Sequence, residues 1–171
     1  MGYALFAQRK VQLTGQLNLV QLQQTQRSNE QYLLATQTLS LQQQMTSLQS
    51  AQSLDLAELY ELLSKTTEDG LNKDEFENTD EYSQTAQELI NSGADREQIN
   101  AKIKEKEAEF EAELDEINRE IYLVSVKENA IEMEVKRLDT QVSALQKQLE
   151  AVEEAEGSAI DRATPKFKGV G

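Results

Sequence analysis

Residues 103–152 read IKEKEAEFEAELDEINREIYLVSVKENAIEMEVKRLDTQVSALQKQLEAV, and apolar side chains recur in this stretch at alternating spacings of four and three. A repeat held over about seven heptads is typical of a coiled coil rather than of an isolated amphipathic helix. Glu107 and Glu128 interrupt it. They are expected either to fix the register as polar residues within the seam or to lie where the bundle is open. The predicted buried seam consists of Ile103, Phe110, Leu114, Ile117, Ile121, Val124, Ile131, Val135, Leu138, Val142, Leu145, Leu149 and Val152.

Local signals on either side set the bounds of this helix. Asp95 is a candidate N-cap, and Gln98 three residues later gives the spacing of a capping box. Gly157, followed by Pro165, marks the predicted end. A helix over residues 95–156 would be about 90 Å long at 1.5 Å per residue. A single helix of that length cannot fold into a globule by itself, so it needs a partner.

Residues 1–66 are predicted to form a second long helix, rich in Gln and Leu and almost free of charge. A seven-residue apolar series runs along it and is broken only by Arg27: Phe6, Leu13, Val20, Leu34, Leu41 and Leu48. Five further leucines lie outside this series, so the helix has apolar residues on more than one side. We expect these five to contact other subunits: Leu5, Leu19, Leu22, Leu33 and Leu39.

An acidic connector is predicted between the two long helices. Gly70 and the polar residues around it are expected to end the first helix, and a short helix is expected from about Thr79 to Asn91. The fold class is therefore all-α, a long coiled-coil helical hairpin. An antiparallel hairpin is the simplest arrangement, and an extended parallel bundle is the alternative. The four predicted parts are residues 1–66, 67–94, 95–156 and a short basic tail over 157–171 that includes Lys166, Phe167 and Lys168.

The second long helix is apolar nearly all round between Ile121 and Val126. A two-stranded coil would leave part of this surface exposed, and exposed apolar patches usually mark protein contacts. The leucine-rich stretch over residues 54–63 is the expected intramolecular cover. A neighbouring subunit is the alternative.

Composition argues against an enzyme. The chain has no Cys and no His, which removes thiolate nucleophiles, the commonest zinc ligands and the side chain that titrates nearest neutral pH. The acidic stretch from Asp69 to Glu81 does not match a calcium-binding loop, because Leu71 and Lys73 stand where oxygen ligands are required. We therefore predict no catalytic residues, no cofactor, no metal site and no small-molecule substrate.

Charge and hydropathy limit the classes of partner that this protein is expected to bind. The net charge is −14, which opposes binding to nucleic acid. Residues 1–54 carry a net charge of +2 and residues 55–171 carry −16, so the two parts are expected to have different neighbours. No apolar run approaches the roughly 20 residues of a membrane span, and the first residues do not resemble a cleaved secretory signal. The protein is expected to be cytoplasmic or exported without a cleaved signal peptide.

These features favour a structural protein that self-associates through its long helices, for example as a subunit of a filament, tube or sheath. Other copies of itself are the expected partner. The alternative is a coiled-coil adaptor, chaperone or scaffold that binds a different protein, such as a component of a secretion system or a virion.

Overall fold

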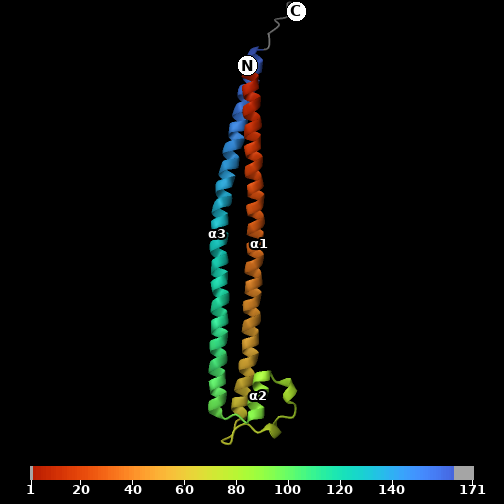
Figure 1. Cartoon of the computed structure of the whole chain (residues 1–171), viewed down its shortest axis with the longest axis vertical. Helices are drawn as coiled ribbons and strands as arrows, with labels where there is room; N and C mark the ends of the chain where they lie inside the picture. The colour runs from red at the N-terminus through yellow and green to blue at the C-terminus, as the bar shows by residue number, and fades with distance from the viewer. Residues whose placement is uncertain (1, 164–171) are drawn as a thin grey trace, which may run out of the picture. The chain divides into compact units, whose positions relative to one another are not determined.

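The computed structural model describes residues 2–163, and this range contains three α-helices, two short 3-10 helices and no strand. The elements are α1 (Gly2–Lys65), η1 (Lys73–Glu75), η2 (Thr79–Glu81), α2 (Gln84–Ser92) and α3 (Arg96–Ala163). The protein is an all-α helical hairpin in which α1 packs against α3 (Figure 1). The predicted fold class is confirmed. Lys166, Phe167 and Lys168 of the predicted basic tail lie outside the described residues.

The contacts divide the chain into two compact units, which we describe separately. The terminal unit consists of residues 2–36 of α1 and residues 125–163 of α3 among the described residues. The connector unit consists of residues 37–124, which include the end of α1, the connecting segment with α2, and the start of α3.

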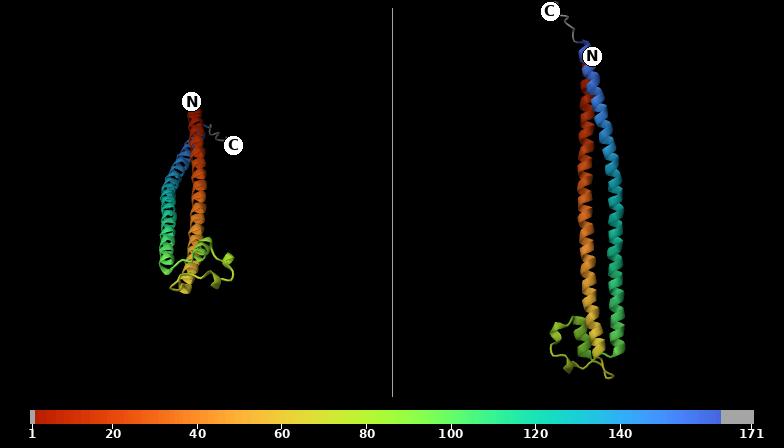
Figure 2. Two further views of the ribbon diagram at one scale, coloured as in Figure 1. Left: turned by 60° about the horizontal axis from the view of Figure 1, so that its bottom comes forward. Right: turned by 180° about the vertical axis from the view of Figure 1, so that it is seen from behind.

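In the terminal unit, the two helical segments run side by side in opposite directions (Figures 1 and 2). The hydroxyl of Tyr3 donates a hydrogen bond to the carbonyl oxygen of Ala159 at 3.5 Å. Further along α1, the Nε atom of Arg27 lies 3.0 Å from a carboxylate oxygen of Glu134. Rising residue numbers in α1 therefore face falling numbers in α3. The structure therefore adopts the antiparallel arrangement, which was predicted as the simplest, and not the parallel alternative.

In the connector unit, the core lies where the end of α1, the connecting segment, α2 and the start of α3 meet. The side chains of Leu62 and Ile99 are fully buried there. The rings of Phe76 and Tyr82 meet edge to face with 5.7 Å between their centroids. One cluster joins all these elements and therefore fixes the connecting segment against the two helix ends. Its buried members are Leu59, Leu62, Leu71, Phe76, Ala86, Ile90, Ala94, Ile99 and Ile103.

Two carboxylates of α1 hold the same segment through polar contacts. Glu58 accepts a hydrogen bond from the backbone N–H of Ser83 at 3.1 Å, at the positive end of α2. Glu61 accepts hydrogen bonds from the hydroxyl of Tyr82 at 3.3 Å and from the ammonium of Lys65 at 3.0 Å. The hydrogen bond from Lys65 lowers the pKa of Glu61 below its ordinary value.

A close backbone approach at two glycines brings the connecting segment back to the start of α3. The backbone N–H of Leu71 donates to the carbonyl oxygen of Ala94 at 2.9 Å. Gly70 has φ = +93°, and a Cβ atom there would overlap the carbonyl oxygen of Gly93. Gly93 has φ = +63° and ends α2 in a Schellman motif, because Ala94 donates to Leu89 while Gly93 itself donates to Ile90. Glycine is required at position 70 both by conformation and by space.

The start of α3 is capped as the sequence predicts. The backbone N–H of Gln98 donates to the carboxylate of Asp95 at 2.8 Å, and the side-chain oxygen of Gln98 accepts from the N–H of Asp95 at 3.0 Å. This reciprocal pair is a capping box, and it satisfies two backbone donors that the first turn of a helix leaves unpaired. The prediction made from the spacing of Asp95 and Gln98 is confirmed.

Two predicted helix boundaries are wrong, whereas the end of the first helix, predicted at residue 66, falls at Lys65. Gly70 lies in the turn that follows, where the backbone N–H of Thr67 donates to the carbonyl oxygen of Gly70. The short helix begins at Gln84 rather than Thr79, because Ser83 caps it by accepting from the N–H of Ala86. The third helix continues through Gly157 to Ala163. An exposed glycine costs a helix interior only about 1 kcal/mol, which a long cooperative helix tolerates.

The prediction that residues 54–63 pack over the apolar surface at residues 121–126 is also wrong. Leu59 and Leu62 point into the connector core instead. Tyr122 and Leu123 are 67% and 51% exposed. Leucines of the 54–63 stretch pack against the connecting segment, because Phe76, Ile90 and their neighbours form an apolar surface that is close in the sequence.

Leu138 tests the packing of the terminal unit. Its side chain is 1% exposed, so Leu138→Ala should lower the free energy of unfolding by about 2–5 kcal/mol, through lost burial and a residual cavity. Met133→Ala is the matched control on the same helix, because Met133 is 71% exposed, and it should change stability by less than about 0.5 kcal/mol. Urea unfolding followed by circular dichroism measures both. Equal losses in the two variants would contradict the packing described here.

Gly70 tests the close backbone approach. Gly70→Ala should lower the free energy of unfolding by at least about 1–2 kcal/mol, because the backbone conformation disfavours a side chain before the overlap with Gly93 is counted. Gly157→Ala should instead raise it by about 0.5–1 kcal/mol, since Gly157 lies in a helix with open space around it. Thermal unfolding of the two variants gives the comparison. A neutral Gly70→Ala would show that the turn is not held in this conformation.

Candidate interaction surface

The side of α3 that faces α1 carries the predicted apolar seam. All thirteen predicted seam residues are buried or half-buried, with Ile103, Phe110, Val124 and Leu138 the most buried. The remaining nine are half-buried: Leu114, Ile117, Ile121, Ile131, Val135, Val142, Leu145, Leu149 and Val152. Glu107, which interrupts the seam, is exposed and accepts from the hydroxyl of Tyr60 at 3.4 Å within the connector unit.

In the terminal unit, polar side chains of α1 occupy several positions that face α3. The ammonium of Lys10 lies 3.5 Å from Glu153 and 3.8 Å from Glu156. The side-chain amide of Gln24 donates to the carboxylate of Asp139. Each contact joins one place on α1 to one place on α3. Together with the pairing of Arg27, they fix the antiparallel register more specifically than interchangeable apolar contacts do.

Arg27 is the centre of the strongest of these contacts. Its guanidinium lies 2.6 Å from Glu30 and 3.0 Å from Glu134. The hydrogen bond with Glu30 and the charge of Glu134 raise the pKa of Arg27 above its ordinary value. The residue that breaks the apolar series of α1 therefore has an ionic role in the helix pair. From the sequence, Arg27 was predicted only as an interruption of the apolar series.

Charge and apolar surface on α1 are distributed in an unusual way. In residues 2–36, three of the four charged side chains take part in the contacts just described, and the fourth, Arg9, bonds to Gln12 beside them. The positions on the opposite side of this segment hold only uncharged residues. Several of those residues are large and apolar, and they are between 55% and 73% exposed: Leu5, Val11, Leu19, Leu22, Tyr32 and Leu33. We call this the outward face of α1.

The five leucines predicted to contact other subunits are all exposed in the structure. Four of them belong to the outward face, and Leu39 is 55% exposed in the connector unit. Four further large apolar residues of the same helix are at least half exposed and were not predicted to be so: Val11, Tyr32, Leu54 and Tyr60. Their positions relative to the buried seven-residue series could have identified them as exposed. Their role in contacts between subunits stays a prediction.

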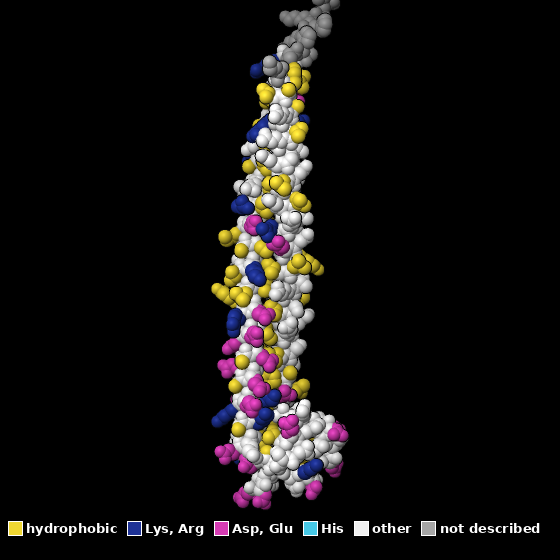
Figure 3. Space-filling model, in the orientation of Figure 1, with side chains coloured by type: hydrophobic (Ala, Val, Ile, Leu, Met, Phe, Trp, Pro, Cys, Tyr) yellow, Lys and Arg dark blue, Asp and Glu magenta, His cyan; other side chains and the backbone are white. Residues whose placement is uncertain are grey.

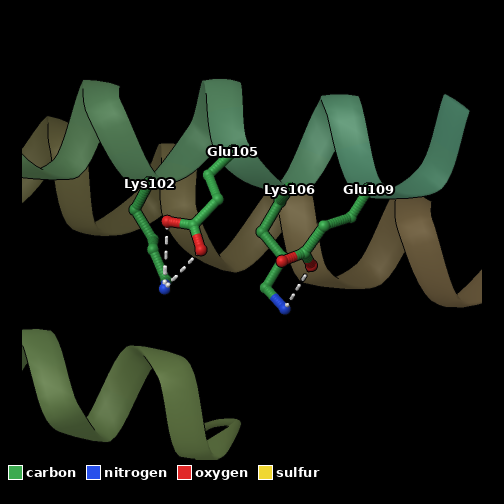
Figure 4. Close-up of polar contacts among 4 residues, drawn as sticks. All are labelled: Lys102, Glu105, Lys106 and Glu109. Carbon is green, nitrogen blue, oxygen red and sulfur yellow. Dashed lines mark hydrogen bonds and ion pairs between the residues drawn. The ribbon is translucent and has the colours of Figure 1, made fainter. Parts of the chain in front are cut away.

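The acidic side chains gather elsewhere. On the side of the molecule drawn in Figure 3 they lie over the connecting segment and the first part of α3. Some are neutralised along the helix itself. Lys102 reaches Glu105 at 3.3 Å and Lys106 reaches Glu109 at 3.2 Å, both one turn away (Figure 4). Such pairs contribute about 0.2–0.5 kcal/mol each, so they support the helix and do not form a reactive site.

Within residues 2–163, no group of three or more Asp and Glu side chains is placed to hold a metal ion. None of the described helices is both long and apolar enough to cross a membrane. The expectations of no cofactor and no catalytic residues stay predictions.

Comparisons with protein-family models, with curated proteins and with solved structures find no match for this chain.

Arg27 and Glu134 can be tested by charge reversal. Arg27→Glu places three carboxylates together and should lower the thermal midpoint, whereas Arg27→Glu with Glu134→Lys should restore much of the loss because the pair is re-formed in the opposite sense. The difference between single and double variants should shrink at high salt, because the residues are partly exposed to solvent. A double variant no more stable than the single would show that the two residues do not interact.

Proposed function

We propose that this protein is a structural subunit that assembles with other copies of itself through the outward face of α1. The observation that carries the proposal is the placement of charge on residues 2–36. Three of the four charged side chains, Lys10, Arg27 and Glu30, form ion pairs on the side toward α3, while the opposite side is uncharged and carries large apolar residues. A helix that met only water on that side would be expected to show the reverse distribution.

The energetic scale supports association. Full burial of a leucine side chain contributes about 1.5–3 kcal/mol. Leu5, Leu19 and Leu33 are 58–67% exposed, so burying the exposed part of them in two copies would contribute about 6–11 kcal/mol. The loss of translational and rotational freedom on association costs about 4–15 kcal/mol. The gain is therefore of the same order as the cost if both copies bury these residues, and half as large if only one does.

Charge supports a second copy as the partner. Helix α1 carries four basic and four acidic residues, so its net charge is zero. Helix α3 carries ten basic and eighteen acidic residues, and the connecting segment is acidic as well. Copies that approached through α3 or the connecting segment would repel one another, whereas the outward face of α1 lets identical chains meet without that penalty.

One observation favours a second candidate, an adaptor that binds a different protein. The connecting segment, residues 66–95, carries nine acidic residues and one basic residue, Lys73. A surface of that charge attracts a basic protein and repels a second copy. This contact would use the connector unit, so it is compatible with self-association through α1.

Charge placed on the outward face tests the proposal. Leu19→Glu with Leu33→Glu should lower the molar mass in solution, measured by light scattering, because every repeated contact would then bring like charges together. Val126→Glu with Met133→Glu is the matched control, because these residues are exposed on α3 and not on α1. The control should keep the wild-type mass, and all variants should keep their helicity. A wild-type chain that runs at 19.3 kDa at all concentrations would overturn the proposal.

A further inference from the structure

Three recesses lie along one side of the terminal unit, in the groove between α1 and α3. Each has an apolar floor contributed by both helices. The first is lined by Phe6, Ala155, Ser158, Ala159 and Arg162. The second is lined by Gln16, Leu19, Val20, Gln141, Ala144 and Leu145. The third is lined by Glu30, Leu33, Leu34, Lys127, Ala130 and Ile131.

The recesses repeat with one period. Every residue of α1 in the third recess is fourteen positions beyond its counterpart in the second, and every residue of α3 is fourteen positions before its counterpart, as the antiparallel direction requires. On α1, Phe6 stands fourteen positions before Val20 of the second recess. Fourteen residues are two heptads, or about 21 Å of helix. The groove therefore carries hollows at a regular spacing of two heptads.

Polar contacts lie in the groove between each pair of neighbouring recesses. Between the second and third recesses, the guanidinium of Arg27 spans to Glu134. Between the first and second, Arg9 bonds to Gln12 along α1. A partner helix that fits this side must place large apolar side chains fourteen residues apart, with polar or small residues between them.

The chain itself carries such a helix. Leu5, Leu19 and Leu33 are exposed and stand fourteen residues apart, at the edge of the outward face that borders the recesses. Leu19 and Leu33 also form the walls of two recesses. Each copy therefore provides both the projecting leucines and the hollows that match their spacing.

We propose that two copies pair with their α1 helices antiparallel about a two-fold axis at Leu19, so that Leu5 of each copy enters the recess beside Leu33 of the other. In this register, residue i of one copy faces residue 38 − i of the other. The pairing uses the same patch on both copies, as a two-fold interface requires. It rests on the proposed self-association and specifies its partner surface and register.

The charges at the edge of the groove favour this direction. Arg9 lies opposite position 29 of the other copy, within reach of Glu30. Arg9 is exposed, and the Glu30 side chain is 44% exposed, so both are accessible to a partner. A parallel pairing in register would instead place Arg9 beside Arg9 and Glu30 beside Glu30, which is unfavourable.

The natural chain has no cysteine, so cysteine cross-linking can read the register directly. Gln12→Cys and Gln26→Cys are exposed substitutions that leave the leucines unchanged, and positions 12 and 26 face each other in the proposed pairing. A mixture of the two variants, oxidised or treated with a short bismaleimide, should give a covalent dimer of twice 19.3 kDa. Either variant alone should give little, because its two cysteines would lie about 21 Å apart.

Gln12→Cys mixed with Ser40→Cys is the matched control, since Ser40 is exposed on the same side of α1 but fourteen residues out of register. It should give no more dimer than the single variants. A wild-type mass above 19.3 kDa would show that the protein self-associates. If, in that case, Gln12→Cys cross-links with itself, or if no pair of variants cross-links, the antiparallel register is wrong although self-association stands. If the wild-type mass stays at 19.3 kDa and no cross-link forms, both proposals fail.

Discussion

The backbone contact between Gly70, Leu71 and the Gly93–Ala94 pair is the constraint on which the hairpin depends. It returns the connecting segment to the start of α3 within hydrogen-bonding distance, at 2.9 Å between Leu71 and Ala94. Apolar side chains from every element of the connector unit then close over this turn. A Cβ atom at position 70 would overlap the carbonyl oxygen of Gly93, so this turn favours glycine there both by conformation and by space.

Along the first half of α1, the residues that contact α3 and the large exposed apolar residues lie on different sides of the helix. Lys10, Gln24 and Arg27 face α3 and fix the register through specific partners. The large apolar residues on the far side of the same segment remain exposed. In the proposed assembly, stability within one copy and association between copies would draw on opposite sides of one helix. A two-fold pairing through α1 is closed at two copies, so larger assemblies would need a further surface.

Much of the architecture follows from local rules that a sequence displays directly. The alternating spacing of Ile103 to Val152 identified a long helix with one apolar side, and the residues Asp95 and Gln98 identified its start. Boundaries were less predictable. The helix α2 begins after Ser83 rather than at Thr79, because Ser83 is the polar residue whose side chain caps the first turn. Glu58, which is far away in the sequence, also accepts a hydrogen bond from the backbone N–H of Ser83. The exposed leucines could be identified from their spacing, whereas the recesses beside them could not.

The sequence by itself determined that the protein is helical, where its long apolar seam lies and which leucines are left outside it, because these properties depend on periodicity along a single helix. The tertiary structure alone decided the antiparallel direction, the ion pair of Arg27 with Glu134 and the recesses that repeat every fourteen residues. Each of these joins residues that are far apart in the chain. Their register depends on the sum of many weak contacts and on the geometry of the turn, neither of which is encoded in a local pattern.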